Sequence, residues 1–575
     1  MAHVLRQRRC RTCVLATFHG WPALMASIRQ DCETRLKGMQ SIRSDYEAEW
    51  KEIARFCQPA RSRFLNGDTN KTARRARNAK LYDEYAIGSY RTLANGMTSG
   101  LSSPSRPWKK LSTYDDALLD EPEVRFWLSE VDRLMDAFFA RTNFYGAAKT
   151  GYHELGLFGT EACVMMEHGD VGMVCHPLTA GEYWISMSDA MVADTLYRRC
   201  PMTARQAVQS FGLNRVSSAV KQAYDTSNSE QLVDVFQAIE PNPQWRPGDP
   251  FSHRFRSIYW DEKDQADRVL RVSGHHDQPF YAPRWDLTGS DIYGYSPAME
   301  GLASIRELQM QNKRENEAID GIVKPEKVTK PGLKLTGQPG NIVSAADVDK
   351  DAVMVPYQMP WQAIEQISNK IGRLYQRIDA TSYADLFMAI TNMQGIQPRN
   401  IEEIAARNEE KLTQLGPTIE RVNNEKLAVA IDRVFGIMMR GNMLPPIPQA
   451  MQGQSEIKVE FVSILTQMQR MVGLGQIERT ASFVGNLAAA FPEAADKLNT
   501  DEMIDEYADR AGTPAQLIRT AEEVGKMRQS RAQQQNQQRM AEMMPAMQQG
   551  ADAARLLSET DVGGAPMLDT LLGAG

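Results

Sequence analysis

The residues of this chain that could carry out chemistry are few and isolated. Cys10 and Cys13 form one CxxC pair, and no second pair follows at zinc-ligand spacing. His275, His276 and Asp277 are the tightest histidine cluster, with no further ligand identifiable near them. A polar strand end is therefore favoured over a metal site at this cluster. We expect no bound metal.

The sequence also lacks the common nucleotide-binding and catalytic motifs. Its nearest approach to a phosphate-binding loop, Val524-Gly525-Lys526-Met527, has neither the second glycine nor the hydroxyl that would bind magnesium. GxSxG, HExxH and EF-hand patterns are absent. We predict that the chain is not an enzyme and needs no cofactor. The alternative, an enzyme with a nonstandard site, would be detected by nuclease or ATPase assays.

Basic side chains on two predicted helices are the best candidates for a functional surface. Lys370, Arg373 and Arg377 fall within about 60° of one another on one helix. Lys313 and Arg314 lie in the polar part of another helix. A solvated surface is the alternative for Lys370, Arg373 and Arg377. Because the net charge is −6, any contact with DNA must be local or weak.

Two sequence segments predict the helices that carry these cations. Ser296-Pro297 has the N-cap hydroxyl and first-turn proline of a helix start, and the stretch 309–317 that follows is polar nearly all round. Such a helix is stable only when neighbours pack against it. The second helix begins after Pro360 and carries one apolar stripe, formed by Trp361, Ile364, Ile367, Ile371, Leu374 and Ile378.

A third helix, predicted between Asn400 and Pro446, is unusually long. Its apolar residues recur in steps of three and four, and some 40 residues would reach roughly 60 Å. Gly416 and Pro417 lie in its middle and predict a kink, because proline removes a backbone donor. A compact core cannot cover such a helix. We therefore expect the chain to pack against other copies of itself.

The remaining sequence predicts a mixed α/β region over residues 41–290 and a helical C-terminal part. No apolar run approaches the roughly 20 residues that span a bilayer, and residues 1–24 do not form a clear secretory signal, so Met25 is a candidate start. The segment Thr203–Gly212 is typical of a capped surface helix, with a helix-turn-helix as the alternative. Further elements are predicted at Leu81–Met97 and Pro122–Phe139 (helices), and at Ala162–Met166, Glu182–Ile185, Leu232–Ile239, His253–Trp260, Arg268–Val272 and Glu456–Val462 (strands).

Six stretches carry a resemblance to a known family. They are ANGMTSGLSSPSRPW (94–108), FGTEACVMME (158–167), PLTAGEYWIS (177–186), YRRCPMTARQAVQSFG (197–212), YGYSPAMEGLASIRELQ (293–309), and EEKLTQLGPTIERVNNEKL with its MLPPIP tail (409–448). In their order and spacing over residues 41–530, they resemble the head-to-tail connector, or portal, proteins of short-tailed podovirus phages.

The resemblance implies an α+β, mainly helical fold with wing, stem, clip and crown in a ring oligomer. It implies an N-terminal extension (1–40), a wing (41–290), stem helices (291–320 and 360–380) that flank a clip (321–359), and a tunnel loop (381–397). A long kinked helix with a return strand (398–462), a helical crown (463–547) and a mobile tail (548–575) would follow. Asn392, Gln394 and Gln397 would lie in the tunnel loop. Lys313, Arg314, Lys370, Arg373 and Arg377 would face the DNA channel or the subunit seams.

The resemblance further implies a homo-dodecamer at one capsid vertex, through which double-stranded DNA is packaged and ejected. Expected partners are the terminase large subunit, a tail or adaptor protein, the major capsid protein, and scaffolding or internal core proteins, with no membrane. The location would be the virion, and the host cytoplasm during assembly. The alternative is another ring-forming virion structural or scaffold protein without a DNA channel.

Overall fold

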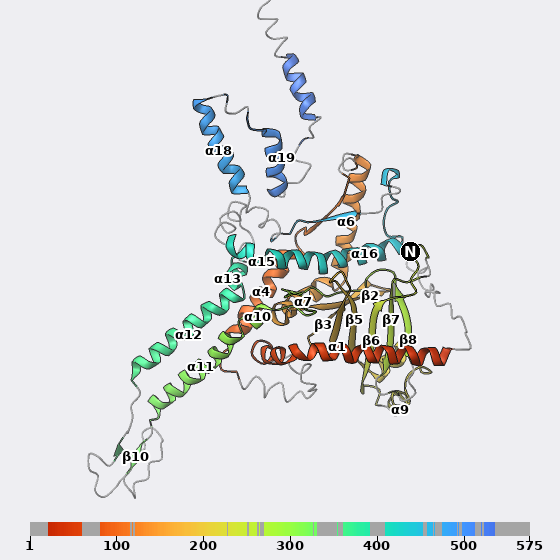
Figure 1. Ribbon diagram of the computed structural model, residues 1–575, viewed down its shortest axis with the longest axis vertical. Helices are drawn as coiled ribbons and strands as arrows, with labels where there is room; N and C mark the ends of the chain where they lie inside the picture. Colours follow the sequence, from red (N-terminus) through yellow and green to blue (C-terminus); the bar gives the residue numbers. More distant parts are fainter. Residues whose placement is uncertain are drawn as a thin grey trace, which may run out of the picture. The chain divides into compact units, whose positions relative to one another are not determined.

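The computed structural model divides the chain into two compact units, residues 1–472 and 473–575. It describes residues 21–59, 81–115, 118, 121–226, 228–249, 252–261, 264, 269–325, 327–329, 353–354, 360–391, 409–451, 457–463, 465, 474–491, 493, 497–511, 519 and 523–534. Figure 1 labels those helices and strands of the two units for which there is room.

A five-stranded antiparallel sheet lies at the centre of the first unit. Its strand order is β4-β5-β6-β7-β8, so each strand pairs with the next along the chain. The strands predicted in this region at Glu182–Ile185, Leu232–Ile239, His253–Trp260 and Arg268–Val272 are confirmed, whereas β5 was not predicted. The strands are β4 (Tyr183–Met187), β5 (Ala193–Thr203), β6 (Leu232–Pro241), β7 (Phe255–Asp261) and β8 (Val269–His275).

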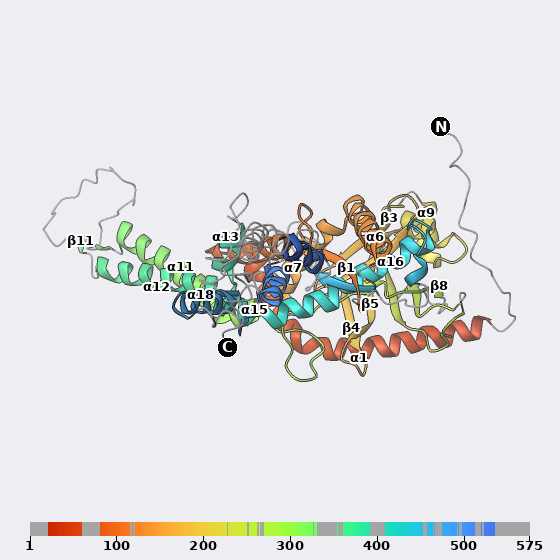
Figure 2. The same cartoon turned by 90° about the horizontal axis from the view of Figure 1, so that it is seen from above.

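Helices cover both faces of this sheet. The long helix α1 (Trp21–Cys57) lies along one face, where Cys32 and Leu36 pack with Phe236 and Trp260 (Figure 2). Because neighbouring strand residues point to opposite faces, Val235 and Tyr259 lie on the other face. There they pack against α8 (Ala204–Phe211) and α9 (Ser218–Asp225). The boundary predicted at residue 40 falls inside α1.

The helix predicted at Thr203–Gly212 is capped, as expected. Thr203 and Gln206 form a reciprocal capping box, in which the Thr203 hydroxyl accepts from the Gln206 backbone N–H at 3.2 Å. Since α8 and α9 bury Ala204, Phe211 and Val220 against the sheet, both helices act as its cover.

A second hydrophobic core lies around the three-stranded sheet β3-β2-β9. In this core, Trp127 and Phe144, which come from two different helices, pack with residues of the long helix such as Ile431 and Val434. A separate ribbon pairs β1 with β12, which are distant in sequence. The elements are α6 (Pro122–Arg141), α7 (Phe144–Phe158), β2 (Ala162–His168), β3 (Gly172–Leu178), β9 (Phe280–Tyr281), β1 (Lys109–Thr113) and β12 (Ile457–Phe461).

The long helix is described from residue 409 onward. It consists of α15 (Glu409–Val422), a π-helical turn η1 (Asn423–Ala428) and α16 (Val429–Arg440). Pro417 lies inside α15, and the kink expected at Gly416 and Pro417 stays a prediction. The irregularity that the sequence did not predict is η1, and a short 3-10 turn (Gln449–Met451) follows the helix. One-turn π-helices inside α-helices are frequent at functional sites.

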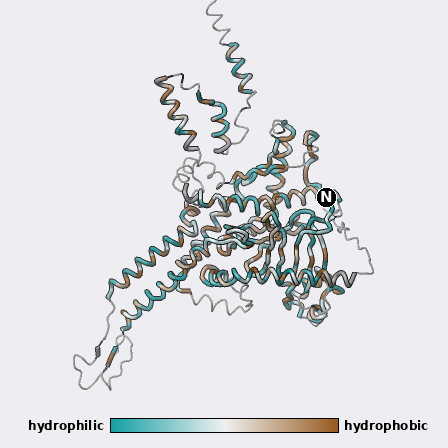
Figure 3. The backbone as a smooth tube through the Cα atoms, in the orientation of Figure 1, coloured by the Kyte–Doolittle hydropathy of each residue, from teal (hydrophilic) through white to brown (hydrophobic). Residues whose placement is uncertain are grey.

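A pair of antiparallel helices extends from the rest of the first unit (Figures 1 and 2). It comprises α11 (Leu302–Val323), which follows the short α10 (Pro297–Glu300), and α12 (Trp361–Thr381). The predicted Ser296 cap is confirmed, because its hydroxyl accepts from the Met299 N–H at 3.0 Å. Beyond the pair, β10 (Val328–Thr329) pairs with β11 (Val353–Met354). Figure 3 shows the helix pair as mostly hydrophilic with interspersed apolar positions.

The end of α12 is held in place by a short helix that packs against a longer one. After α12 the chain turns at Tyr383, whose φ of 54° is left-handed, and enters α13 (Ala384–Thr391). Phe387 of α13 is fully buried against α4 (Tyr85–Leu101) at Gly96. Part of the segment predicted as a tunnel loop is therefore a packed helix. Asn392, Gln394 and Gln397 lie outside the described residues.

The second unit contains α18 (Leu474–Ala490), α19 (Thr500–Ala511) and a helical stretch at 523–534. Tyr507 donates to Glu478 at 3.1 Å, and Arg528 binds Asp501 through two hydrogen bonds of 2.6 and 2.7 Å. Among the described residues of the whole chain, no helix combines the length and apolarity that crossing a membrane requires.

Candidate nucleic-acid interface

The predicted basic residues of α12 are brought together on its exposed side. Ile364, Ile371, Leu374 and Ile378 form the buried stripe of this helix, so the side chains on its other side face solvent. Lys370, Arg373 and Arg377 are all exposed. With Gln366, Asn369 and Leu374 they line a surface hollow of about 400 Å³.

One ion pair connects this basic side to α11. Lys370 Nζ lies 2.5 Å from Glu307 Oε1, and this contact holds the pKa of Glu307 below its usual value. Arg314 follows Glu307 by seven residues, which is two helical turns, and so shares its side of α11. We call Arg314, Lys370, Arg373 and Arg377, with Glu307, the basic face. Its four cations and one carboxylate leave an excess of three positive charges.

Lys313 is the one candidate cation that the helix geometry separates from this group. It is next to Arg314 in sequence and therefore points about 100° away around α11. Its Nζ lies 3.5 Å from Glu317 Oε1 on the same helix, and both side chains are at least half exposed. Such a pair contributes little to stability, so Lys313 serves as a natural comparison for the basic face.

Polar contacts inside the chain fix the base of the helix pair. Gln309, which is buried, accepts from the Tyr82 N–H at 2.8 Å and donates to the Asp83 carbonyl at 2.7 Å. Asn312 and Tyr375 both donate to Asp83 Oδ2, at 3.1 and 2.7 Å. Part of the polar stretch 309–317, for which we expected partners from other copies, thus finds them within its own chain.

A second hollow, of about 430 Å³, lies beside α4 and the end of α12. Asp379 is its central carboxylate, and it accepts from Ser89 Oγ at 2.7 Å and from the Tyr85 hydroxyl. Burial, followed by Asp379 and then Asp385, raises the pKa of Tyr85. The remaining lining comes from Glu84, Ile87, Gly88, Arg91, Thr92 and Met388.

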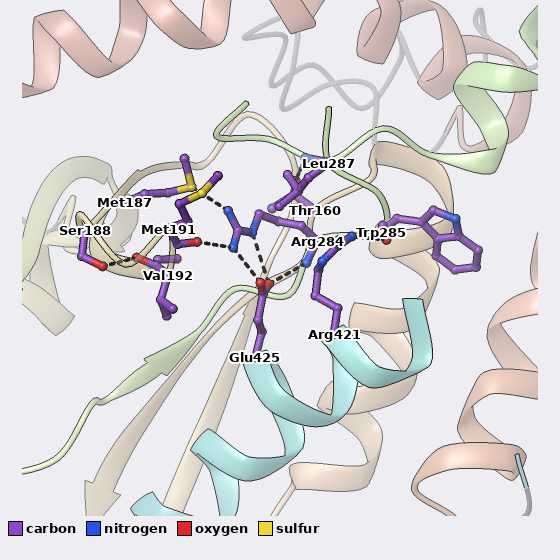
Figure 4. Close-up of polar contacts among 12 residues, drawn as sticks. Thr160, Met187, Ser188, Met191, Val192, Arg284, Trp285, Leu287, Arg421 and Glu425 are labelled. Atoms are coloured by element: carbon purple, nitrogen blue, oxygen red, sulfur yellow. Dashed lines mark hydrogen bonds and ion pairs between the residues drawn. The ribbon is translucent and has the colours of Figure 1, made fainter. Parts of the chain in front are cut away.

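Arg284 connects the helix pair to the long helix (Figure 4). Its Nη2 donates to Glu425 Oε1 at 2.6 Å and to the Met191 carbonyl at 2.8 Å, and its guanidinium is 1 % exposed. Arg421 donates to the Trp285 carbonyl at 2.9 Å. Because α10 starts at Pro297, thirteen residues after Arg284, the chain enters the helix pair from a segment that η1 holds in place.

A second ion pair on η1 is completely buried. Lys426 Nζ lies 2.8 Å from Glu161 Oε2, and neither side chain is exposed. Lys426 also lies 3.4 Å from the centre of the Tyr152 ring, a cation–π contact. Burial raises the pKa of Glu161 and lowers that of Lys426, while their attraction opposes both shifts.

Sequence reasoning did not find these buried charges, although a signal was present. Lys426 lies four residues after Val422, and Arg433 follows seven residues later, so both occupy the apolar side of the long helix. Arg433 is fully buried and lies 3.1 Å from Glu167 and 3.3 Å from Asp277. A buried charge needs a partner of opposite charge, and the structure provides one for each: the buried Glu161 for Lys426, and the more exposed Glu167 and Asp277 for Arg433.

The histidine cluster has a structural role. Burial, then the nearby Arg433, lowers the pKa of His275 to about 3, so the ring is neutral at pH 7. His276 stacks on His253 with ring centres 4.4 Å apart. Within the described part of the chain, no group of three His, Cys, Asp or Glu side chains could hold a metal. Cys10 and Cys13 lie outside that part.

Comparisons with known proteins agree with the resemblance seen in the sequence. The "Portal protein" of Salmonella phage epsilon15 is 35% identical over 92% of this chain and 94% of its own length. The "Probable portal protein" of Bordetella phage BPP-1 is 36% identical over 91% and 94%. A chain of a native gene transfer agent virion covers 73% of this chain and 88% of its own length, at 10% identity and a TM-score of 0.31. Since the model of the bacteriophage head to tail connecting proteins matches residues 29–518, the chain belongs to that family.

Proposed function

We propose that this chain is the portal subunit of a short-tailed DNA phage. Twelve copies would form a ring at one capsid vertex, through which double-stranded DNA is packaged and ejected. The observation that carries this proposal is the 35–36% identity to two phage portal proteins over more than nine-tenths of the chain. Relatives that match over nearly their whole length support a shared role for the whole chain, rather than for one shared domain.

The layout of the first unit fits this role. Residues 41–290 would form the wing, α11 and α12 the stem, and residues 321–359 the clip that binds the terminase large subunit and later a tail or adaptor protein. The helix pair supports this assignment, because a pair composed mostly of hydrophilic residues suits a water-filled channel and polar seams. Residues 463–547 would form the crown.

The energy for packaging would come from a separate motor. The sequence lacks a phosphate-binding loop, so DNA translocation requires an ATPase that docks on the ring. The major capsid protein and scaffolding or internal core proteins would surround the wing. In this proposal the protein resides in the virion, after assembly in the host cytoplasm. The alternative is a ring-forming virion protein without a DNA channel. A portal ring would have an opening along its axis that admits DNA, and the alternative would not.

Electron microscopy and native mass spectrometry of the purified full chain test this proposal. We expect a ring of about 775 kDa, twelve times the chain mass of 64.6 kDa, with an axial opening wide enough for duplex DNA. A closed ring without such an opening would favour the alternative. A stable monomer or compact dimer at micromolar concentration, with no annulus, would refute both.

A further inference from the structure

Helix α12 presents two sides of opposite charge. Lys370 and Asp379 are nine residues apart, which is two and a half turns, so they point to opposite sides of the helix. One side is the basic face, with its hollow of about 400 Å³. The other holds the hollow beside α4, whose lining contains the carboxylates of Glu84 and Asp379 and one cation, Arg91.

These two sides suit a ring. A ring is built by repeating one heterologous contact, in which a surface on one side of a subunit meets a different surface on the far side of the next. Such surfaces must be complementary, and an excess of positive charge opposite an excess of negative charge fulfils this requirement. Both surfaces also lie at the same end of α12, since Arg377 and Asp379 are two residues apart.

A position on the channel wall suits the basic face less well. Each phosphate that a protein neutralises adds salt-dependent affinity for DNA. Three excess cations per copy, repeated around a ring, would surround the duplex with dozens of positive charges. A conduit through which DNA must slide in both directions is better served when these cations are covered by neighbouring subunits.

We propose that the basic face of one copy docks against the hollow beside α4 of the next copy. Arg373 and Arg377 of one subunit would then lie against Glu84 and the rim around Asp379 of its neighbour. This inference rests on the proposed ring and assigns the basic face to the subunit seam. Tyr85 and Ser89 donate hydrogen bonds to Asp379 within one subunit, so its carboxylate is already held in place where the neighbour would dock.

Charge reversal with rescue tests the contact in the full-length chain. The double variant Arg373→Glu/Arg377→Glu places like charges at every seam, and we expect at least about a tenfold rise in the subunit concentration at half-assembly. Adding Glu84→Arg to the same chain should restore assembly, because each seam then regains opposite charges. Glu84 is chosen because it is exposed, whereas Asp379 also holds α12 to α4.

Lys313→Glu is the matched control. It reverses an exposed cation on the same helix pair but outside the basic face, and we expect rings at the wild-type concentration. Assembly is measured by native mass spectrometry and light scattering at low and high salt. Circular dichroism and the thermal midpoint establish that each variant is folded, which is expected because the altered side chains are exposed.

The outcomes separate this inference from the proposed function. Rings that form normally in Arg373→Glu/Arg377→Glu would overturn the seam assignment and leave the portal proposal intact. If those rings also released DNA more readily, the basic face would line the channel. Failure of Glu84→Arg to restore assembly would overturn the pairing. A wild-type chain that forms no ring would refute the proposed function itself, before any variant is made.

Discussion

Removing the buried ammonium of Lys426 should destabilise the first unit strongly, and by an amount that depends on pH. The variant Lys426→Met keeps most of the side-chain volume but leaves the Glu161 carboxylate without its cation. Neither residue is exposed, so water cannot replace the lost contact. Breaking a buried ion pair from one side typically costs about 3–5 kcal/mol, because an uncompensated charge remains inside.

The pKa of Glu161 sets an upper limit on this cost. An isolated buried carboxylate can become neutral by taking up a proton, and each pH unit above its ordinary pKa of 4.5 adds about 1.4 kcal/mol to that step. The limit is therefore about 5 kcal/mol at pH 8 and about 2 kcal/mol at pH 6. Since the raised pKa makes the folded variant bind more protons than the unfolded one, the variant should gain stability relative to wild type as the pH falls from 8 to 6.

Urea unfolding of the full chain, followed by tryptophan fluorescence at both pH values, measures this difference; Trp50 is fully buried in the first unit. The control is Glu161→Gln/Lys426→Met, which removes both charges and should be close to wild type at either pH. Equal destabilisation of the single and double variants, without pH dependence, would show that packing rather than charge is responsible and would refute the reasoning.

Two further predictions concern other parts of the first unit. His275 has a pKa of about 3 in the folded chain, so the unfolded chain binds one more proton between about pH 3 and 6.5 and stability falls as the pH falls. His275→Asn should reduce that slope by up to about 1.4 kcal/mol per pH unit in the same urea assay, and an unchanged slope would exclude this role. At Gly96 an added Cβ would overlap Phe387, so Gly96→Ala should cost about 1–3 kcal/mol and lower the thermal midpoint. Gly146→Ala in helix α7 meets nothing within 4 Å and should instead be neutral or stabilising; equal effects of the two would contradict the packing argument.

The elements that the sequence predicted well are those specified by local rules. Ser296 and Pro297 have the chemistry of a helix start, and the helix begins there. The predicted apolar stripe repeats at helical spacing, and α12 buries four of its six residues, Ile364, Ile371, Leu374 and Ile378. Ile367 is half-buried, and Trp361, at the start of the helix, is exposed. These signals depend only on residues that are close in sequence, so they predict the helices without knowledge of distant contacts.

The features that the sequence did not predict depend on distant partners. The kink expected at Pro417 stays a prediction, and the structure contains a π-helical turn at Asn423–Ala428 that the sequence did not predict. Glu425 and Lys426, on that turn, bind Arg284 and Glu161, which are more than 140 residues away in the chain. The sequence near the turn does not show these partners. The π-helical turn is favourable because its side chains form ion pairs with residues far away in the chain.

The candidate surface was predicted in part. Helical spacing grouped Lys370, Arg373 and Arg377 correctly, but it did not separate Lys313 from Arg314. The contact between Lys370 and Glu307 separates them, because it shows which side of α11 lies next to the basic side of α12. Glu84 gave no signal of its own in the sequence. Its place opposite the basic face follows only from the packing of α4 against α12.

The two ends of the helix pair differ in how firmly they are held, and this difference bears on where assembly acts. At the base, Ser296 donates to the Leu157 carbonyl at 2.8 Å and Arg284 is bound to η1, so the start of α10 is fixed by buried groups. Towards the far end, Ile319, Val323 and Trp361 are 41%, 68% and 67% exposed. Apolar side chains that gather on a surface mark sites that bind other proteins. The base therefore sets the direction of the helix pair within one chain, and we expect its far end to contact other copies or partners in the proposed ring.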